Sequence, residues 1–128
     1  MTNLDIANRF FNALLAGDAA ELDSLFAKDA TFWQNFSGRD QHRDSFLPGF
    51  AKLAGMITDL QFANVRRIGT ASGFVEQHTL RGTTASGAAL AADGCFIAQV
   101  KDGKIDRVEE YLDGAQLGPL MAPRGAQA

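Results

Sequence analysis

Apolar residues recur at helical spacing over the first part of the chain. In residues 4–16, apolar side chains three or four positions apart mark one face of a helix. Its members are Ile6, Phe10, Phe11, Leu14 and Leu15. Gly17 ends this helix, and Asp18 is placed to cap a second short helix with the stripe Leu22, Leu25 and Phe26. The pattern therefore predicts two helices joined by a tight turn.

Residues 30–36 have the composition of a strand, because they are rich in aromatic and β-branched residues and are followed by Ser37-Gly38. A third helix is predicted to begin near Asp40 or Gln41. Its apolar positions are Phe46, Leu47, Phe50, Leu53 and Met56. Pro48 and Gly49 interrupt this stripe, so we expect a kink or break there.

The helical signal ends after Thr58 and extended segments follow. They cover residues 59–69, 74–84, 88–100 and 105–112. Residues 71–73 and 85–87 and the pair Asp102-Gly103 have the composition of hairpin turns. The tail beyond Asp113 contains several glycines and prolines and is expected to be irregular. We assign residues 1–120 to one domain and residues 121–128 to an irregular C-terminal tail.

The order helix, helix, strand, helix and four strands predicts an α+β fold. In such a fold, three N-terminal helices wrap a curved, mostly antiparallel sheet. A curved sheet closed by helices leaves a concavity between the two layers, and concavities of this kind are common sites for apolar ligands.

Composition narrows the range of partners. Of the 128 residues, 46% are hydrophobic and 21% are charged, which is typical of a globular domain. The net charge is −3 and no run of Lys or Arg occurs, so nucleic acid is not expected as a partner. No stretch approaches the length of a membrane helix and no signal peptide is apparent, so we expect no membrane association and a cytoplasmic location.

Cofactor and metal chemistry find no support in the sequence. Cys95 is the only cysteine, so no internal disulfide can form, and no Cys/His pair has the spacing of metal ligands. No Gly-rich phosphate loop or nucleophile motif is present. We therefore expect a protein without cofactor or metal.

Two long segments carry a family likeness: NRFFNALLAGDAAELDSLFAKDATFWQNFSGRD near the N-terminus and VKDGKIDRVEEYLDGAQLGPL near the C-terminus. Together they resemble the SnoaL-like branch of the nuclear transport factor 2-like superfamily, over residues 3–120. The resemblance implies a cone-shaped α+β barrel with a central apolar pocket, and a homodimer. It does not fix the activity, because this superfamily includes isomerases, cyclases, dehydratases, epoxide hydrolases and proteins without catalytic activity.

Ketosteroid isomerase resembles the first third of the chain, but its functional residues are replaced. Its helix-borne tyrosine falls at Phe10, and its first-strand aspartate falls at Gln34 or Asn35. Its proton-donating aspartate falls near Phe96. A phenyl ring donates no hydrogen bond and an amide accepts no proton, so that mechanism is excluded here.

Limonene-epoxide hydrolase offers a second comparison. Its Tyr-x-Asn and its last-strand aspartate resemble Trp33-x-Asn35 and Glu110, whereas its Arg-x-Asp aligns with Gln77-x-Thr79. The basic and acidic partners of that hydrolysis are therefore absent. A further likeness is to uncharacterised SnoaL-like proteins with the pattern EQHxLRGT…DGxIxRxxEYLD.

His78 is the first candidate for catalysis. Strand alternation places it on one face with Phe74, Glu76 and Leu80, which is the more apolar face, and so predicts that it points inward. The hydrolase alignment would instead turn the opposite face inward. A partly buried histidine beside a carboxylate is suited to proton transfer near neutral pH, although a purely structural histidine fits the same pattern.

Glu110 is the second candidate. It lies between Val108 and Leu112 on the apolar face of the last strand, where a carboxylate must be protonated, paired or hydrogen-bonded. We predict that it partners His78; the alternative is a glutamate at the wet rim of the sheet. For substrate binding the predicted residues are Trp33, Asn35, Glu76, Asp93, Phe10 and Phe96. The Asp93-Gly94 pair also has the composition of a bulge or turn.

These residues lead to a hypothesis of a cofactor-free lyase, isomerase or cyclase acting on a small hydrophobic molecule, aromatic or polyketide-like. Its catalytic residues would be His78 and Glu110. One alternative is a non-catalytic small-molecule-binding module. Another is an epoxide hydrolase in which Glu110 and Asn35 activate water.

Overall fold

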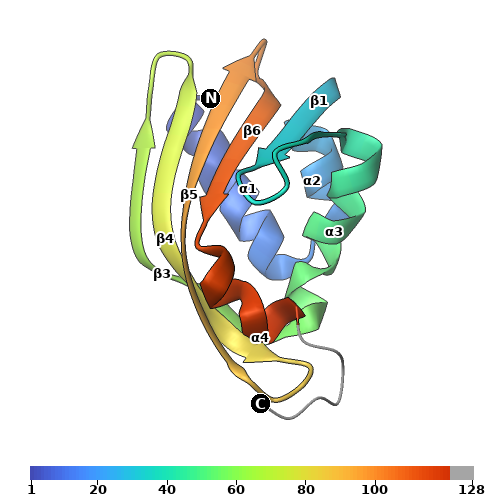
Figure 1. The fold of residues 1–128 in the computed structure, drawn as a ribbon. Coiled ribbons are helices and arrows are strands. Elements are labelled where there is room, and N and C mark those ends of the chain that lie inside the picture. The colour runs from blue at the N-terminus through green and yellow to red at the C-terminus, as the bar shows by residue number, and fades with distance from the viewer. Residues whose placement is uncertain (122–128) are drawn as a thin grey trace.

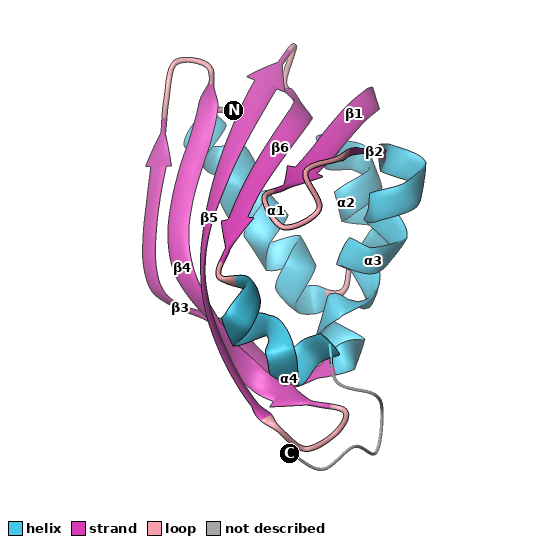
Figure 2. Cartoon of the chain, in the orientation of Figure 1, coloured by secondary structure: helices cyan, strands magenta, loops and turns pink. Residues whose placement is uncertain are grey.

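The computed structural model describes residues 1–121 as a curved sheet with helices on its concave side (Figure 1, Figure 2). The helical elements are α1 (Asn3–Ala16), α2 (Ala19–Leu25), α3 (Arg43–Met56), the 3-10 turn η1 (Gly114–Leu117) and α4 (Gly118–Met121). The strands are β1 (Phe26–Gln34), β2 (Asp40–His42), β3 (Ile57–Gly69), β4 (Gly73–Thr84), β5 (Ala89–Lys101) and β6 (Lys104–Leu112). The predicted α+β class is confirmed.

The six strands form one sheet in the order β2-β1-β6-β5-β4-β3. The pairs β3–β4, β4–β5 and β5–β6 are antiparallel hairpins, whereas β1 runs parallel to β6. The sequence did not indicate β2, because its three residues fall where the third helix was expected to begin. The four long segments predicted after Thr58 match β3 to β6 within a few residues at each end.

The first two helices begin and end as their sequence predicts. Thr2 caps α1 through its side chain, which accepts a hydrogen bond from the Asp5 backbone N–H, and Gly17 ends the helix in a left-handed conformation. The side chain of Asp18 caps α2 by accepting from the Glu21 backbone N–H at 3.1 Å. The α1–α2 hairpin is therefore encoded locally.

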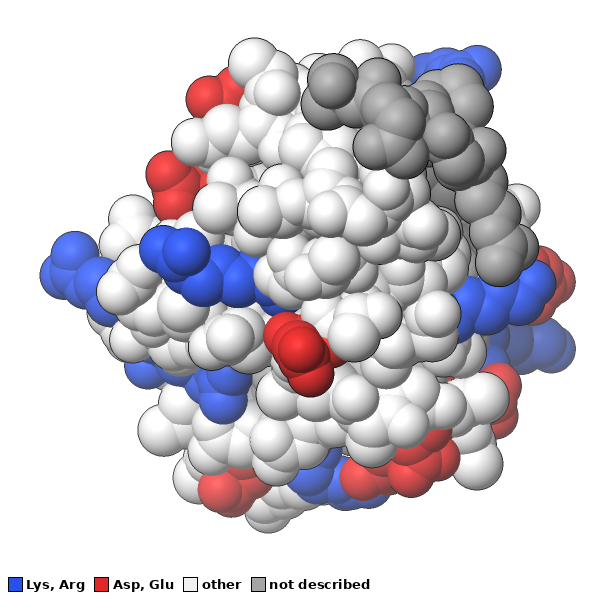
Figure 3. Space-filling view, turned by 90° about the horizontal axis from the view of Figure 1, so that it is seen from below, with Lys and Arg blue, Asp and Glu red and all other residues white. Residues whose placement is uncertain are grey.

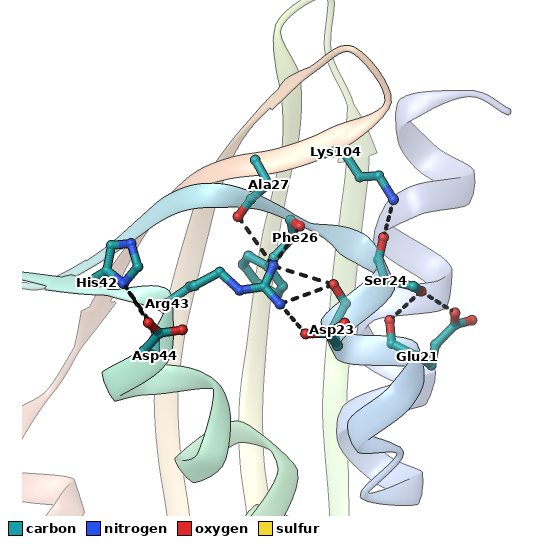
Figure 4. Close-up of polar contacts among 9 residues, drawn as sticks. All are labelled: Glu21, Asp23, Ser24, Phe26, Ala27, His42, Arg43, Asp44 and Lys104. Atoms are coloured by element: carbon teal, nitrogen blue, oxygen red, sulfur yellow. Dashed lines mark hydrogen bonds and ion pairs between the residues drawn. The ribbon is translucent and has the colours of Figure 1, made fainter.

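Arg43 fixes the junction between α2, β1 and α3 (Figure 4). Its guanidinium donates to the Phe26 backbone carbonyl at 2.9 Å and to the Ala27 carbonyl at 3.3 Å, and it forms an ion pair with Asp23. His42 caps α3 by accepting from the Asp44 backbone N–H. These contacts explain why β1 already begins at Phe26 and why α3 begins later than predicted.

Pro48 does not break the third helix. The helix runs from Arg43 to Met56 with Pro48 inside it, so of the expected kink or break, the break does not occur. Phe46 and Phe50, on either side of the proline, pack their rings 5.2 Å apart and both contact Phe26 and Phe32. We attribute the continuity of the helix to this aromatic packing, which offsets the hydrogen bond that proline cannot donate.

The chain after Asp113 is not the irregular tail expected from its composition. Asp113 caps η1 by accepting from the Ala115 backbone N–H at 3.0 Å, and Leu117 is buried. The short helix α4 follows directly. Burial of Leu117 against the sheet supplies an apolar anchor that a composition rich in glycine and proline does not reveal. The remainder of the predicted tail, residues 122–128, lies outside the described residues.

Charged side chains of both signs are scattered among uncharged ones on the face seen from the β4–β5 hairpin end (Figure 3). Among the residues that the structure describes, no helix combines the length and the apolar character needed to cross a membrane.

Gly73 and Gly55 provide a test of how closely the sheet is packed. A Cβ atom at Gly73 would lie 1.8 Å from the Ala98 carbonyl oxygen, whereas at Gly55 in α3 nothing lies within 4 Å. We expect Gly73→Ala to lower the free energy of unfolding by at least about 1–3 kcal/mol, because the paired backbone must shift. Gly55→Ala should be neutral or stabilise by up to about 1 kcal/mol. Urea unfolding of both variants measures this; equal midpoints would contradict it.

Candidate functional site

A pocket of about 170 Å³, here called the inner pocket, lies between the concave face of the sheet and the helices. Most of its lining is apolar and comes from the helices, the sheet and the segment after β6: Leu14, Phe36, Gly49, Phe50, Leu53, Phe62, Leu80, Phe96, Leu112, Leu117 and Leu120. Among the described residues, the polar members of the lining are Gln34, His78 and Glu110. The pocket therefore matches the predicted apolar concavity and holds both predicted catalytic residues.

Glu110 enters this pocket beside an amide rather than beside a histidine. Gln34 on β1 is the register partner of Glu110 on β6, so both side chains leave the sheet on the same side. The Gln34 Nε2 atom donates to the Glu110 Oε1 atom at 2.6 Å. Burial raises the pKa of Glu110 to about 7, and the hydrogen bond from Gln34 opposes this only in part. A buried carboxyl in this range can donate or accept a proton at neutral pH.

His78 belongs to a separate buried chain of polar groups. Its Nδ1 atom lies 2.7 Å from the Glu76 Oε2 atom, and the other carboxylate oxygen of Glu76 bonds the Arg67 guanidinium. Arg67 also donates to the Asn8 side-chain oxygen at 2.9 Å and lies over the Phe11 ring at 4.6 Å. The carboxylate of Glu76 is therefore held between a cation and an imidazole, with no exposed surface.

The Arg67–Glu76 pair determines which atom of His78 is free. Because Glu76 accepts a hydrogen bond at Nδ1, we assign the proton to Nδ1 and leave Nε2 as the unsatisfied ring nitrogen. A Cβ atom at Gly94 would lie 3.5 Å from Nε2 and 2.8 Å from a Leu112 methyl carbon. The absence of a side chain at Gly94 thus leaves space beside Nε2.

His78 and Glu110 face one pocket but do not bond each other. Each has its own partner, Glu76 and Gln34 respectively, so the expectation of a direct His78–Glu110 pair is wrong. The register explains this: Glu110 is opposite Phe96, whereas His78 is opposite Gly94, two strands and two residues away. At typical strand spacing their Cα atoms are roughly 12 Å apart. The arrangement places two titratable groups on different sides of one cavity.

Trp33 and Asn35 are not in the inner pocket, so their predicted orientation is wrong. Trp33 lies on the outer face of the sheet, where its ring is 5.3 Å from that of Tyr111. The Asn35 amide bonds both the backbone N–H and the carbonyl of Leu112, at 3.0 and 3.1 Å. The family motif directed attention to these two residues, but the buried Phe32 fixes the alternation so that Gln34 points inward.

The other predicted binding residues divide between core and surface. Phe96 lines the inner pocket. Phe10 and Glu76 are fully buried and do not line it; the Phe10 ring packs 6.0 Å from that of Phe96. Asp93 is exposed on the outer face, where it accepts from the Thr79 hydroxyl at 2.7 Å, so it is not an inward acid. It lies within β5 rather than in a turn.

A second, more open depression lies at the outer face near the end of β6, and we call it the outer groove. It has a volume of about 460 Å³, and its lining is mostly polar: Asn64, Gln77, Thr79, Asp93, Cys95, Tyr111 and Asp113, with His78, Gly94 and Leu112. Burial raises the pKa of the Cys95 thiol, so its thiolate is disfavoured. Within residues 1–121, no three or more His, Cys, Asp or Glu side chains are grouped to hold a metal ion.

Three parts of the site were not predicted. Gln34 shares the inward face of β1 with Phe32, and the alternation of that strand indicates this. Arg67 is the cross-strand partner of Glu76, a pairing that needs the β3–β4 register and its bulge. Leu117 and Leu120 line the pocket from a segment whose composition indicated irregular structure.

Comparison with known families identifies the family to which this fold belongs. Residues 7–108 match the SnoaL-like domain family. The chain therefore belongs to the SnoaL-like family, within the nuclear transport factor 2-like fold, as the sequence resemblance implied. No curated protein matches the chain closely enough to count as a relative.

Solved structures share the fold at low sequence identity. An NTF2-like protein of unknown function from Burkholderia pseudomallei superposes with a TM-score of 0.78 at 18% identity, covering 95% of this chain and 100% of that one. A proposed polyketide cyclase from Pseudomonas putida gives 0.77 at 22% identity, covering 91% and 95%. A protein with a ketosteroid isomerase-like fold from Catenulispora acidiphila, in complex with trimethylamine, gives 0.74 at 15%, covering 96% and 97%. These likenesses establish the fold alone.

The raised pKa of Glu110 predicts a pH-dependent stability. The folded-state pKa of about 7 exceeds the ordinary value of 4.5, so the folded chain holds this proton more tightly than the unfolded chain. The bound proton therefore stabilises the folded state. This stabilisation is complete below pH 4.5, falls as the pH rises and is lost above about pH 7. Glutamine at this position cannot ionise, so Glu110→Gln does not bury a charge at high pH, and at pH 8 the variant should be more stable than the wild type by up to about 3 kcal/mol.

Urea unfolding in steps from pH 4 to pH 9 measures the effect. Glu109→Gln is the matched control, because Glu109 lies on the outer face beside Arg107 and should retain the wild-type pH dependence. The prediction fails if Glu110→Gln and Glu109→Gln give the same slope.

Proposed function

We propose that this protein is a cofactor-free acid/base enzyme of the lyase, isomerase or cyclase type, acting on a small hydrophobic molecule in the inner pocket. The observation that carries the proposal is the Glu110 carboxyl, with its pKa near 7, in an apolar cavity that also contains His78. Perturbed titratable groups gather at functional sites. A solved structure with the same fold is a proposed polyketide cyclase, and proton transfer on a small hydrophobic molecule is consistent with that likeness.

In this mechanism, His78 acts as the base and Glu110 as the acid. The free Nε2 atom of His78 takes a proton from an acidic C–H or O–H bond of the substrate, and Glu76 stabilises the imidazolium that forms. The protonated Glu110 gives its proton to another atom of the same molecule, while Gln34 fixes the carboxyl group. After product release, one proton passes from His78 to Glu110 through solvent, and the starting state returns.

The structure gives less support to the two alternative hypotheses, a binding module and an epoxide hydrolase. A binding module without catalysis would use the same apolar pocket, but it requires neither the buried Glu110 nor the Arg67–Glu76–His78 chain. The epoxide hydrolase hypothesis relied on Asn35 to orient water, and the Asn35 amide is engaged with the Leu112 backbone instead. The acid/base hypothesis is therefore the one that accounts for both polar sites.

Hydrogen–deuterium exchange into bound compounds tests the proton transfer without knowledge of the natural substrate. The wild-type protein in D₂O is incubated with a panel of cyclic enones, ketones and phenols, and proton NMR follows the loss of C–H signals. We expect at least one compound to exchange faster with the protein than without it. His78→Gln and Glu110→Gln should each slow this exchange about 10²–10⁴-fold, because each removes one proton carrier.

His42→Gln is the control, since His42 lies at the N-terminus of α3 outside the inner pocket. It should retain wild-type exchange. If the wild type and the His78→Gln/Glu110→Gln double variant exchange every compound equally, the proposed chemistry is wrong. Circular dichroism confirms that each variant is folded.

We also infer a homodimer formed through the outer face of the sheet, as the sequence resemblance implied. Ile97 and Tyr111 are 39% and 45% exposed there, and the Trp33 ring packs against that of Tyr111 at a tilt of 60°. Contiguous exposed apolar side chains on a sheet are typical of association surfaces. Size-exclusion chromatography with light scattering should give the mass of two chains for the wild type and for Asn12→Glu, whose added charge lies on α1 and away from the outer face of the sheet. Ile97→Glu should give one chain, because it places a charge in this interface; a monomeric wild type contradicts the inference.

A further inference from the structure

The inner pocket is small for a ligand site. Pockets that bind drug-sized ligands usually have volumes of about 300–1,000 Å³, whereas this one has about 170 Å³. An engineered apolar cavity of about 150 Å³ is known to hold one benzene molecule. By this comparison, the space accepts a single six-membered ring with a small substituent and excludes a second fused ring.

The segment after β6 sets this limit on size. Leu117 and Leu120 line the pocket from this segment, which is bonded to the rest of the chain at Leu112 and at Gln116. Asn35 binds the Leu112 backbone, Asp113 caps η1, and the Gln116 side-chain oxygen accepts from the Asp93 backbone N–H at 2.8 Å. Because bonds at Leu112 and Gln116 hold the segment, the position of Leu117 is fixed, and Leu120 follows three residues later in α4.

The lining also selects against charge on the ligand. No Lys or Arg lines the inner pocket among the described residues, and Arg67 lies behind Glu76, with which it is paired. An anionic ligand would place an unpaired charge among leucine and phenylalanine side chains, which is strongly unfavourable. A cationic ligand would need Glu110 in its charged form, which burial disfavours.

The two polar positions define what the ligand must carry. The Glu110–Gln34 pair presents a carboxyl and an amide at one side of the pocket, whereas the rings of Phe62 and Phe96 flank His78 at centroid distances of 4.6 and 5.6 Å. A carbonyl or hydroxyl group can bond the carboxyl while its ring packs against the phenylalanines. A ligand without a polar group would leave the Glu110 carboxyl incompletely bonded.

From these observations we propose that the inner pocket binds a neutral molecule built on one six-membered ring with a single carbonyl or hydroxyl group. This inference rests on the proposed function, because it takes the inner pocket as the substrate site. The inference narrows the substrate class of the proposed enzyme, because it excludes polycyclic, anionic and cationic compounds.

A matched set of five probes tests the three requirements separately by isothermal titration calorimetry. The reference is p-cresol, and the others change one feature each: 2-naphthol adds a ring, 4-methylbenzoate adds a negative charge, 4-methylbenzylamine adds a positive charge, and toluene lacks the polar group. We expect p-cresol to bind at least tenfold more tightly than each of the other four. Tighter or equal binding of any one of these four probes overturns the proposal, as does the absence of binding by all five.

Variants of the pocket lining confirm that the binding occurs in this pocket. Leu120→Ala enlarges the space and should raise the affinity for 2-naphthol at least tenfold relative to that for p-cresol. Leu53→Ala does the same from α3 if the first variant disturbs the chain after β6. Leu15→Ala is the control, because Leu15 is exposed and does not line the pocket. An unchanged ratio in both enlarged variants contradicts the assignment.

The binding series and the exchange experiment test the ligand class and the catalytic proposal separately. If p-cresol binds selectively but no compound undergoes accelerated exchange, the ligand class stands and the catalytic proposal is wrong. If a polycyclic ketone undergoes exchange that depends on His78 and Glu110, the catalytic proposal stands and the ligand class is wrong.

Discussion

The hydrogen bond between Gln34 and Glu110 inside an apolar cavity is the interaction on which the site depends. A bare carboxylate among leucine and phenylalanine side chains would be highly unfavourable. The amide of Gln34 gives one carboxyl oxygen a partner, and burial favours the protonated state of the other. The pairing exists because β1 runs parallel to β6, which brings two inward side chains from distant parts of the sequence to the same level of the sheet.

The second polar group, His78, is held by an ion pair rather than by an amide. His78 has no amide partner; it is bound to a carboxylate whose charge is already balanced by Arg67. Arg67 in turn contacts Asn8 and Phe11 on α1. The orientation of the imidazole is therefore set by the packing of α1 against β3 and β4. Glu110 is held by a bond within the sheet, whereas His78 is held through the contact between the sheet and a helix.

How much of this site the sequence predicts depends on the residue. Strand alternation placed His78, Glu76 and Glu110 correctly, because β4 and β6 are regular strands with one buried face. The same rule applied to β1 would have selected Gln34, but the likeness to a hydrolase motif favoured Trp33 and Asn35. Neither the Arg67–Glu76 pairing nor the lining by Leu117 and Leu120 could be predicted from the sequence, because both depend on contacts that local patterns do not specify. The continuity of α3 through Pro48 depends likewise on rings contributed by β1.

The parallel contact between β1 and β6 also constrains how the molecule assembles. Gln34 and Glu110 are 76 positions apart along the chain. Closing so long a loop is entropically unfavourable until the intervening hairpins have formed. β6 follows the other described strands in the chain, so it is synthesised after them. Until it is made, the edges of β1 and β5 that pair with it have no partner. The inner pocket and the β1–β6 pairing are therefore completed in the same step.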